Sequence, residues 1–427
     1  MSEKQAGVLP IIGIIYILST AFPAWLRPEN TLYGLQPADF IFLFLVVFLL
    51  LKSDFGKFIL RESKDTFTTR NGLFSLNGAV LLYVASVGIS AAFNCGAEVM
   101  KEFIGTLYLA TLYLCFKYIF SAFGLSFSDK SIRLLGLAAA LTGLSGWMLH
   151  TVGIDNPTGL VRDYPYFGRV FRLQGFTPTP AFFYNIVGFV FIYVWTAGRQ
   201  QFSRFVHYGL LILLGFALIL TLSKSLLLTA AIILFYEALK RRKYLKVAGF
   251  AAAFFLLFFM QIATHFLFVS CTAAAREESL QDDMYVSNVP IYRSGDFCIL
   301  ETNYLLYKRS ALICAARNFP LGVGLGQHTH FLQKLAEEPA YAEKYRGQSG
   351  DTHSTYTGML CETGFLGFVA VVFIFFLLFK NSARLLPSFW WVALFFALEA
   401  VNTDIMNFRH FWIFIAAVAA FTVRRQS

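Results

Sequence analysis

Apolar residues in this chain form blocks of about twenty, and most charged residues stand between the blocks. A helix needs about twenty mostly apolar residues to cross the hydrocarbon core of a bilayer. The pattern therefore predicts an all-α integral membrane protein with about twelve transmembrane helices. The predicted spans are Val8–Leu26, Ala38–Leu51, Leu73–Phe93, Glu102–Phe123, Leu134–Val152, Thr179–Ala197, Phe205–Leu222, Ser225–Leu239, Val247–Val269, Ser354–Phe379, Leu385–Asn402 and Phe408–Val423.

Positively charged residues are divided unevenly between the two sides of this predicted bundle. Twelve spans place both termini on one side, where the connecting segments hold nineteen Lys and Arg residues. The short opposite segments hold seven, if Arg409 at the start of the last span is counted with them. The long segment Cys271–Thr352 is not counted, because long translocated loops are exempt from the positive-inside rule. The bias predicts cytoplasmic termini and places Gly153–Pro178 and Cys271–Thr352 on the far side.

The long far-side segment lies between the ninth and tenth spans and is partly helical by its pattern. The residue pattern of this segment predicts an amphipathic helix over Asn303–Arg317, with Thr302 as its cap. A glycine-rich turn follows, and then a second, more polar helix around Phe331–Tyr345. We therefore predict a single polytopic membrane domain over residues 1–427, in which residues 271–352 form a loop that acts as a lid.

Composition narrows the class of protein further. The chain is 57% hydrophobic and 14% charged, whereas a soluble domain carries about 25% charged residues. A soluble enzyme, a disordered chain and a secreted disulfide scaffold are therefore poor interpretations. The net charge of +10 comes from basic residues beside apolar blocks, so we expect membrane lipids as partners and no nucleic acid.

Six scattered cysteines contain no C-x-x-C pair, which argues against a metal ribbon or a redox dithiol. Cys271 and Cys298 flank a polar loop and could pair in an oxidising compartment. Val8–Leu26 is too long for the apolar region of a signal peptide, so we expect it to be the first span.

Ionisable residues at span ends on the far face are the candidates for chemistry, because charge near hydrocarbon is costly. Arg172 precedes the sixth span, where a guanidinium can hold a phosphate through paired N–H bonds; an interfacial arginine is the alternative. Lys224 occupies the tight turn between the seventh and eighth spans, as an anion ligand or an interface anchor. Arg309 and Arg317 share a face of the predicted loop helix.

His353 opens the predicted tenth span, and the positive end of a helix disfavours an imidazolium. A neutral imidazole near pH 7 is what a general base requires; a hydrogen-bonded interfacial histidine is the alternative. Asp404, in the last far-side loop, could orient this histidine or pair with an arginine. The Gly-x-Gly-x-Gly run at residues 322–326 is not a dinucleotide motif, since no strand precedes it.

Several of these motifs, in order between Arg172 and Asp404, resemble the bacterial O-antigen ligase and polymerase superfamily of membrane glycosyltransferases. The last motif is the most specific. Lysine stands at 224 where the family pattern has arginine. The motifs are Arg172-Leu-Gln-Gly175 followed by Pro178 and Pro180, Ser223-Lys224, Arg309 with Pro320-Leu-Gly-Val-Gly324, and His353-Ser354 with Glu362-Thr-Gly364-Phe-Leu-Gly367.

The resemblance implies an inverting, metal-independent transfer of a glycan from undecaprenyl diphosphate, with no cofactor. His353 would deprotonate the acceptor hydroxyl, and Arg172, Lys224 and Arg309 would hold the diphosphate. Arg293 is a rival to Arg309, because loop motifs align loosely, and Asp404 would support the site. Fixed cations fit this chemistry, because the early far-side loops lack the carboxylate pair of a metal-dependent enzyme.

The resemblance favours an O-antigen ligase that joins the lipid-linked glycan to a lipid A–core sugar, in the bacterial inner membrane with its active site facing the periplasm. An O-antigen polymerase and a protein O-oligosaccharyltransferase of the same superfamily are alternatives. A polysaccharide transporter or flippase is an alternative from another class. Transporters place charges near the bilayer midplane, whereas this chain gathers them at one face, which favours interfacial chemistry.

Overall fold

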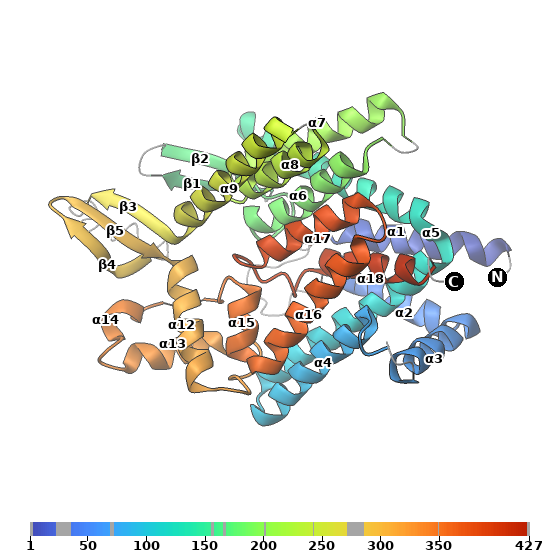
Figure 1. Cartoon of the computed structure of the whole chain (residues 1–427), viewed down its shortest axis with the longest axis horizontal. Helices are drawn as coiled ribbons and strands as arrows, with labels where there is room; N and C mark the ends of the chain where they lie inside the picture. Colours follow the sequence, from blue (N-terminus) through green and yellow to red (C-terminus); the bar gives the residue numbers. More distant parts are fainter. Residues whose placement is uncertain are drawn as a thin grey trace.

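The computed structural model describes residues 3–22, 36–68, 72–154, 158–164, 168–199, 202–241, 243–270, 286–348 and 350–424. A bundle of apolar helices makes up most of the molecule, and a cap of strands and short helices covers one end (Figure 1). Both chain ends lie at the opposite end of the bundle (Figure 1). The bundle helices are α1 (Glu3–Ser19), α2 (Pro37–Leu50), α3 (Ser53–Thr68), α4 (Leu76–Phe93), α5 (Ala97–Thr151), α6 (Pro180–Ala197), α7 (Arg204–Leu220), α8 (Leu226–Lys240), α9 (Lys243–His265), α15 (Thr355–Glu362), α16 (Gly364–Ser382), α17 (Pro387–Glu399) and α18 (Arg409–Arg424).

Apolar helices occur at the places that the hydrophobic blocks predict. Among the described residues, five helices (α4, α5, α6, α9 and α16) are long and apolar enough to cross a membrane, and further apolar helices are shorter. The fourth and fifth predicted spans both lie in α5, which bends at Gly124, where φ is 80°. The described residues are therefore mostly helical, which is consistent with the predicted helical membrane protein. The number of twelve spans stays a prediction.

Two predicted spans have ends or interiors that differ from the prediction. The ninth was expected to run to Val269, but α9 ends at His265 and the chain continues as a strand. The tenth is broken, because α15 ends at Glu362 and α16 begins at Gly364, whose φ of +70° interrupts the helix.

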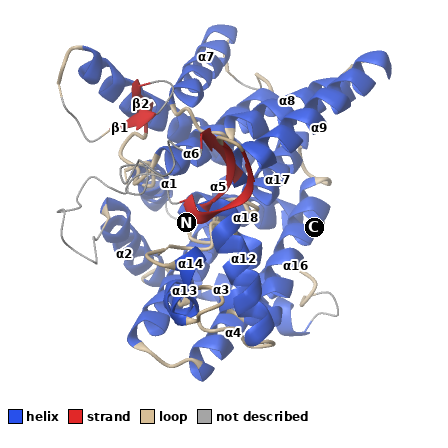
Figure 2. Cartoon of the chain, turned by 90° about the vertical axis from the view of Figure 1, so that its left-hand side faces the viewer, coloured by secondary structure: helices blue, strands red, loops and turns tan. Residues whose placement is uncertain are grey.

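The described residues include five short strands that were not predicted. They form a two-stranded antiparallel hairpin and a separate three-stranded antiparallel sheet of order β3-β5-β4, drawn in red in Figure 2. The apolar run of β3 continues the block of α9 without a break, so its pattern cannot be told from the end of a helix. The strands are β1 (Gly159–Tyr164), β2 (Gly168–Leu173), β3 (Phe266–Ser270), β4 (Val286–Ser294) and β5 (Phe297–Thr302).

The lid helices follow this sheet and pack on one another. The first is α12 (Asn303–Arg317), with Thr302 as its N-terminal cap residue, as predicted. The second predicted helix is two helices, α13 (His328–Glu337) and α14 (Ala342–Tyr345), because Pro339 disfavours helix at the residue before it. Their buried side chains form a small core of Leu306, Tyr307, Leu332, Leu335 and Tyr345.

The structure describes the state of five of the six cysteines. Cys298, in β5, is disulfide-bonded. Cys95, Cys115, Cys314 and Cys361 are free, and Cys271 lies outside the described residues.

Helix α3 is a further element that the hydrophobic blocks do not predict. Its buried face carries Phe55 and Phe58, whose rings both pack edge-on against Tyr118 of α5 at 5.3 Å. Glu62 on the same face forms an ion pair with Lys117, and both side chains are buried. This pair accounts for the one lysine that falls inside a predicted span.

Candidate functional site

His353 lies immediately before α15 rather than in its first turn. The helix begins at Thr355, and the Ser354 hydroxyl accepts a hydrogen bond from the backbone N–H of Thr357 at 3.4 Å. His353 itself has φ +49°. Among the described residues, Leu222 is the other non-glycine residue with positive φ, and it neighbours Lys224. Sparsely populated backbone conformations of this kind gather at functional sites.

The imidazole of His353 lies against the first turns of lid helix α12. Its ring centroid is 5.2 Å from that of Tyr304 and 5.6 Å from that of Tyr307. The Asn303 amide donates a hydrogen bond to Nε2 at 3.3 Å. The first turns of α12 therefore contact the imidazole that stands just before α15, although about fifty residues separate the two segments in the chain.

Electrostatics at this position favour a neutral imidazole. Burial lowers the pKa of His353 below its ordinary value, the Lys308 ammonium lowers it further, and Asp351 opposes both effects. At neutral pH the ring is consequently unprotonated, which is the form that accepts a proton from a hydroxyl.

Lys308 follows Tyr304 by one turn of α12, and Tyr304 packs against His353, so Lys308 is the lid cation whose charge acts on this imidazole. Its ammonium donates a hydrogen bond to Nε2 of His265, the last residue of α9, at 2.9 Å, and another to the side-chain oxygen of Asn402. Burial lowers the pKa of Lys308 to about 8. The resemblance assigns the diphosphate role to Arg309, and no signal in the sequence selects Lys308 instead.

Arg309 points to a different part of the lid. Its guanidinium pairs with Glu301 at 2.6 Å, and Lys344 pairs with the other carboxylate oxygen of Glu301 at 2.6 Å. Glu301 is fully buried. These residues line a cavity of about 280 Å³ with Pro290, Ile291, Ala340 and Glu343. Arg293, the rival arginine, is exposed on β4 opposite Cys298. Among the described contacts, none joins either arginine to His353.

Arg172 and Lys224 come together at a second position. Arg172, on β2, donates from Nε to the backbone oxygen of Thr221 at 3.0 Å, in the turn between α7 and α8 that also holds Lys224. Partial burial lowers the pKa of Lys224, and the nearby charge of Arg172 lowers it further. Two cations held this close favour an anion between them.

Asp404 supports the start of α15 rather than the histidine directly. Its carboxylate accepts hydrogen bonds from the Thr355 hydroxyl at 3.3 Å and from the Asn407 amide at 2.7 Å. Burial and, to a lesser extent, the nearby charge of Asp351 raise the pKa of Asp404 to about 7. Asp404 therefore fixes the helix that begins two residues after His353.

The glycine-rich loop is docked into the break between α15 and α16. The N–H groups of Val323 and Gly324 donate to the backbone oxygens of Cys361 and Glu362 at 3.0 and 2.9 Å. A Cβ on Gly322 would lie 2.5 Å from the Glu362 oxygen, so only glycine fits. The two glycine motifs of the sequence therefore contact each other. The N–H groups of the loop bond to carbonyls that the helix break leaves without a helical partner.

The Glu362 side chain, at the same helix break, also contacts the lid. Its carboxylate accepts a hydrogen bond from the backbone N–H of His328, the first residue of α13, at 3.3 Å. His328 is buried, and its ring bonds to Ser310 at 2.8 Å and to the Gly350 oxygen at 3.0 Å. Glu362 and His328 therefore tie the lid to the bundle.

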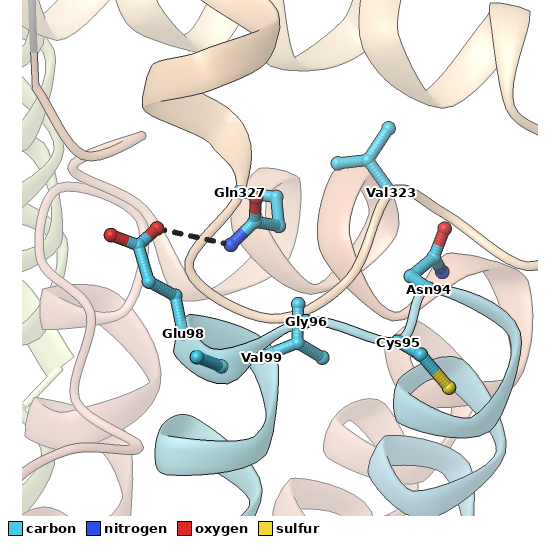
Figure 3. Close-up of a pocket in the computed structure, with 8 residues that line it drawn as sticks. Asn94, Cys95, Gly96, Glu98, Val99, Val323 and Gln327 are labelled. Atoms are coloured by element: carbon cyan, nitrogen blue, oxygen red, sulfur yellow. Dashed lines mark hydrogen bonds between the residues drawn. The ribbon is translucent and has the colours of Figure 1, made fainter.

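A second cavity, of about 370 Å³, opens beside this loop (Figure 3). It lies between the turn from α4 to α5 and the lid residues Val323 and Gln327. The Gln327 amide donates to Glu98 at 3.5 Å, and the neighbouring His330 bonds to the same carboxylate at 2.9 Å. The lid thus has a second attachment to the bundle.

Over the described part of the chain, no three His, Cys, Asp or Glu side chains are grouped as metal ligands. The absence of a metal requirement stays a prediction that a chelator tests.

Comparison with known protein families gives one partial match, over the middle of the chain. Residues 209–372 match a family model described as O-antigen ligase. The match confirms the resemblance to the O-antigen ligase and polymerase superfamily and spans Lys224, Arg309, the glycine-rich loop and His353. Arg172 and Asp404 lie outside it. No curated protein matches the chain.

Proposed function

We propose that this protein is an O-antigen ligase, which moves a glycan from undecaprenyl diphosphate to a sugar hydroxyl of the lipid A–core. The observation that carries the proposal is the position of His353, which is held between the lid and the start of α15 inside the segment that matches the family model. Burial lowers the pKa of this imidazole, which favours its neutral form. The proposed reaction uses neither a cofactor nor a metal.

In the proposed reaction, His353 accepts the proton of the acceptor hydroxyl. The acceptor oxygen then attacks the anomeric carbon of the donor sugar from the face opposite the diphosphate. A new glycosidic C–O bond forms, the C–O bond to the diphosphate breaks with its electron pair, and undecaprenyl diphosphate leaves. The product has inverted configuration, and His353 returns its proton to solvent.

The cations that hold the diphosphate are also proposed. Arg172 and Lys224 support this role, because they lie together at one turn. Lys224 offers a point charge where an arginine would offer a bidentate fork. Arg309 would have to exchange its contact with Glu301 for a phosphate. Loss of one phosphate-binding cation is expected to cost about 2–4 kcal/mol of transition-state stabilisation, by analogy with an oxyanion-hole donor.

The proposed topology has twelve spans, cytoplasmic termini and a periplasmic lid formed by residues 271–352, in the inner membrane. The disulfide at Cys298 supports a periplasmic lid, because disulfides persist in oxidising compartments. The opposite placement of the lid and the chain ends supports the same orientation (Figure 1).

The lipopolysaccharide of a deletion strain tests the acceptor. Loss of a ligase leaves bare core and long lipid-linked chains. A core capped with single repeat units would instead show a polymerase, and unchanged lipopolysaccharide with loss of glycoprotein would show a protein O-oligosaccharyltransferase. Substrate movement across vesicles by purified protein, without glycan transfer, would show a transporter.

A further inference from the structure

Lys308 is a half-buried cation whose hydrogen-bond acceptors are both neutral. The ammonium donates to the His265 ring nitrogen and the Asn402 amide oxygen. Lys344 and Arg309, the other cations in this part of the lid, both pair with Glu301. Among the described contacts of Lys308 there is no carboxylate. A partly buried charge without a counter-ion is costly, so it signals an anion that binds in another state of the protein.

The position of Lys308 links three parts of the molecule. Lys308 lies on lid helix α12, His265 ends the helix α9, and Asn402 lies in the connection from α17 to α18. The charge of Lys308 also acts on His353. An ammonium has three N–H donors, and the contacts with described residues occupy two of them, so one is left for a further acceptor in this part of the chain.

We propose that Lys308 forms an anion subsite beside His353, which binds the phosphate oxygens of the lipid-linked donor. The proposal rests on the proposed function, since it names a residue for the diphosphate of that donor. As the anomeric C–O bond breaks, negative charge develops on the departing oxygen, and a fixed cation beside the base stabilises it. Lys308 rather than Arg309 is then the diphosphate cation of the lid.

A lysine gives this subsite a pH dependence that an arginine would not. The groups that face Lys308 are His265 from α9, His353 ahead of α15, and neutral Asn402. Glu301 from β5 is engaged by Arg309 and Lys344, and His328 from α13 bonds to Ser310. Since the pKa of Lys308 is lowered to about 8, the cation is present below pH 8 and is lost as pH rises above it.

The experiment measures kcat/KM for the lipid-linked donor between pH 6 and 9.5 in phosphatidylcholine vesicles. The wild type should lose about tenfold per pH unit above pH 8. Lys308→Arg should remain active without this alkaline fall, because a guanidinium does not deprotonate in this range. Lys308→Gln should lose on the order of 10²–10³-fold at pH 7. Lys334→Gln, which removes an exposed lid lysine, should match the wild type.

Two results would overturn the proposal: an alkaline fall in Lys308→Arg equal to that of the wild type, or near-normal kcat/KM in Lys308→Gln. Inhibition by inorganic pyrophosphate provides a second measurement, and it should weaken in Lys308→Gln but not in Lys334→Gln. If phosphatidylglycerol in the vesicles inhibits the wild type but not Lys308→Gln, a phospholipid headgroup occupies the subsite instead. If the wild type transfers no glycan at all while pyrophosphate still binds through Lys308, the proposed function fails and the anion subsite stands.

Discussion

At the scale of single residues, the candidate site depends on which way neighbouring side chains point. Successive residues on a helix are separated by about 100° around its axis, so Lys308 and Arg309 face different parts of the lid. Lys308 reaches His265 and Asn402, whereas Arg309 reaches Glu301. A charge pattern alone cannot select between them, because the choice depends on how α12 packs.

The electrostatics of His353 predict an acid limit on activity. Burial lowers the pKa of this imidazole, so the neutral base survives to lower pH than a free imidazole, whose pKa is about 6.5. Activity should be full above the lowered pKa and should fall as pH drops through it. In the pH profile of kcat/KM, the midpoint of the acid limb should therefore lie below pH 6.5.

Asp351 opposes this shift and offers a check on the assignment. Because its charge raises the pKa of His353, Asp351→Asn should move the acid limb to lower pH. The exposed acid Glu337 on α13 gives a control, and Glu337→Gln should leave the limb in place. An acid limb that is identical in all three proteins would exclude His353 as the titrating base.

At the scale of elements, the lid is attached to the bundle through a broken helix. The break at Gly364 frees the oxygens of Cys361 and Glu362, and the loop with Gly322 and Gly324 supplies the N–H donors. Both glycine motifs can be recognised in the sequence, and they follow one another in the same order as in the family pattern. Their mutual contact could not be predicted, because it joins segments about forty residues apart.

Gly322→Ala should destabilise the protein more than Gly347→Ala. Both glycines have positive φ, 74° and 72°, which costs an alanine about 1–2 kcal/mol. Only at Gly322 would the new Cβ also meet backbone, at 2.5 Å from the Glu362 oxygen, whereas at Gly347 nothing lies within 4 Å. Thermal unfolding of the purified proteins in detergent should show the larger fall in Tm for Gly322→Ala, and equal falls would contradict the docked loop.

The hydrophobic blocks predicted the helices better than the strands. Blocks near α4, α6 and α16 are long and uniform, so length alone identifies them. Strands β1 to β5 are short and pair with one another, and such pairing depends on contacts outside each strand. For the candidate site, the sequence alone indicates the residues at 172, 224, 353 and 404. The contacts of Lys308 with His265 and Asn402 can be seen only in the fold.

At the scale of the whole molecule, the account depends on which end faces outward. Cys95 lies in the turn from α4 to α5 beside the lid residues Val323 and Gln327, at the end away from the chain termini (Figures 1 and 3). It is free and exposed, whereas Cys115, Cys314 and Cys361 are buried. Labelling of Cys95 can therefore show on which side of the membrane the lid lies.

A membrane-impermeant maleimide should label Cys95 in intact spheroplasts. In a Cys95→Ser background, a cysteine introduced at the exposed Ser63 of α3 should react only after the membrane is permeabilised. The reverse result would place the lid and His353 in the cytoplasm, away from any periplasmic acceptor.

Glycan transfer by the purified protein, from a defined undecaprenyl-diphosphate donor to lipid A–core, tests the central claim most directly. The wild type should form product of inverted configuration at the same rate with and without EDTA. His353→Ala, while it still binds the donor, should lose on the order of 10²–10⁴-fold in rate. Undiminished turnover by His353→Ala, or activity that EDTA removes and Mg²⁺ restores, would contradict the account.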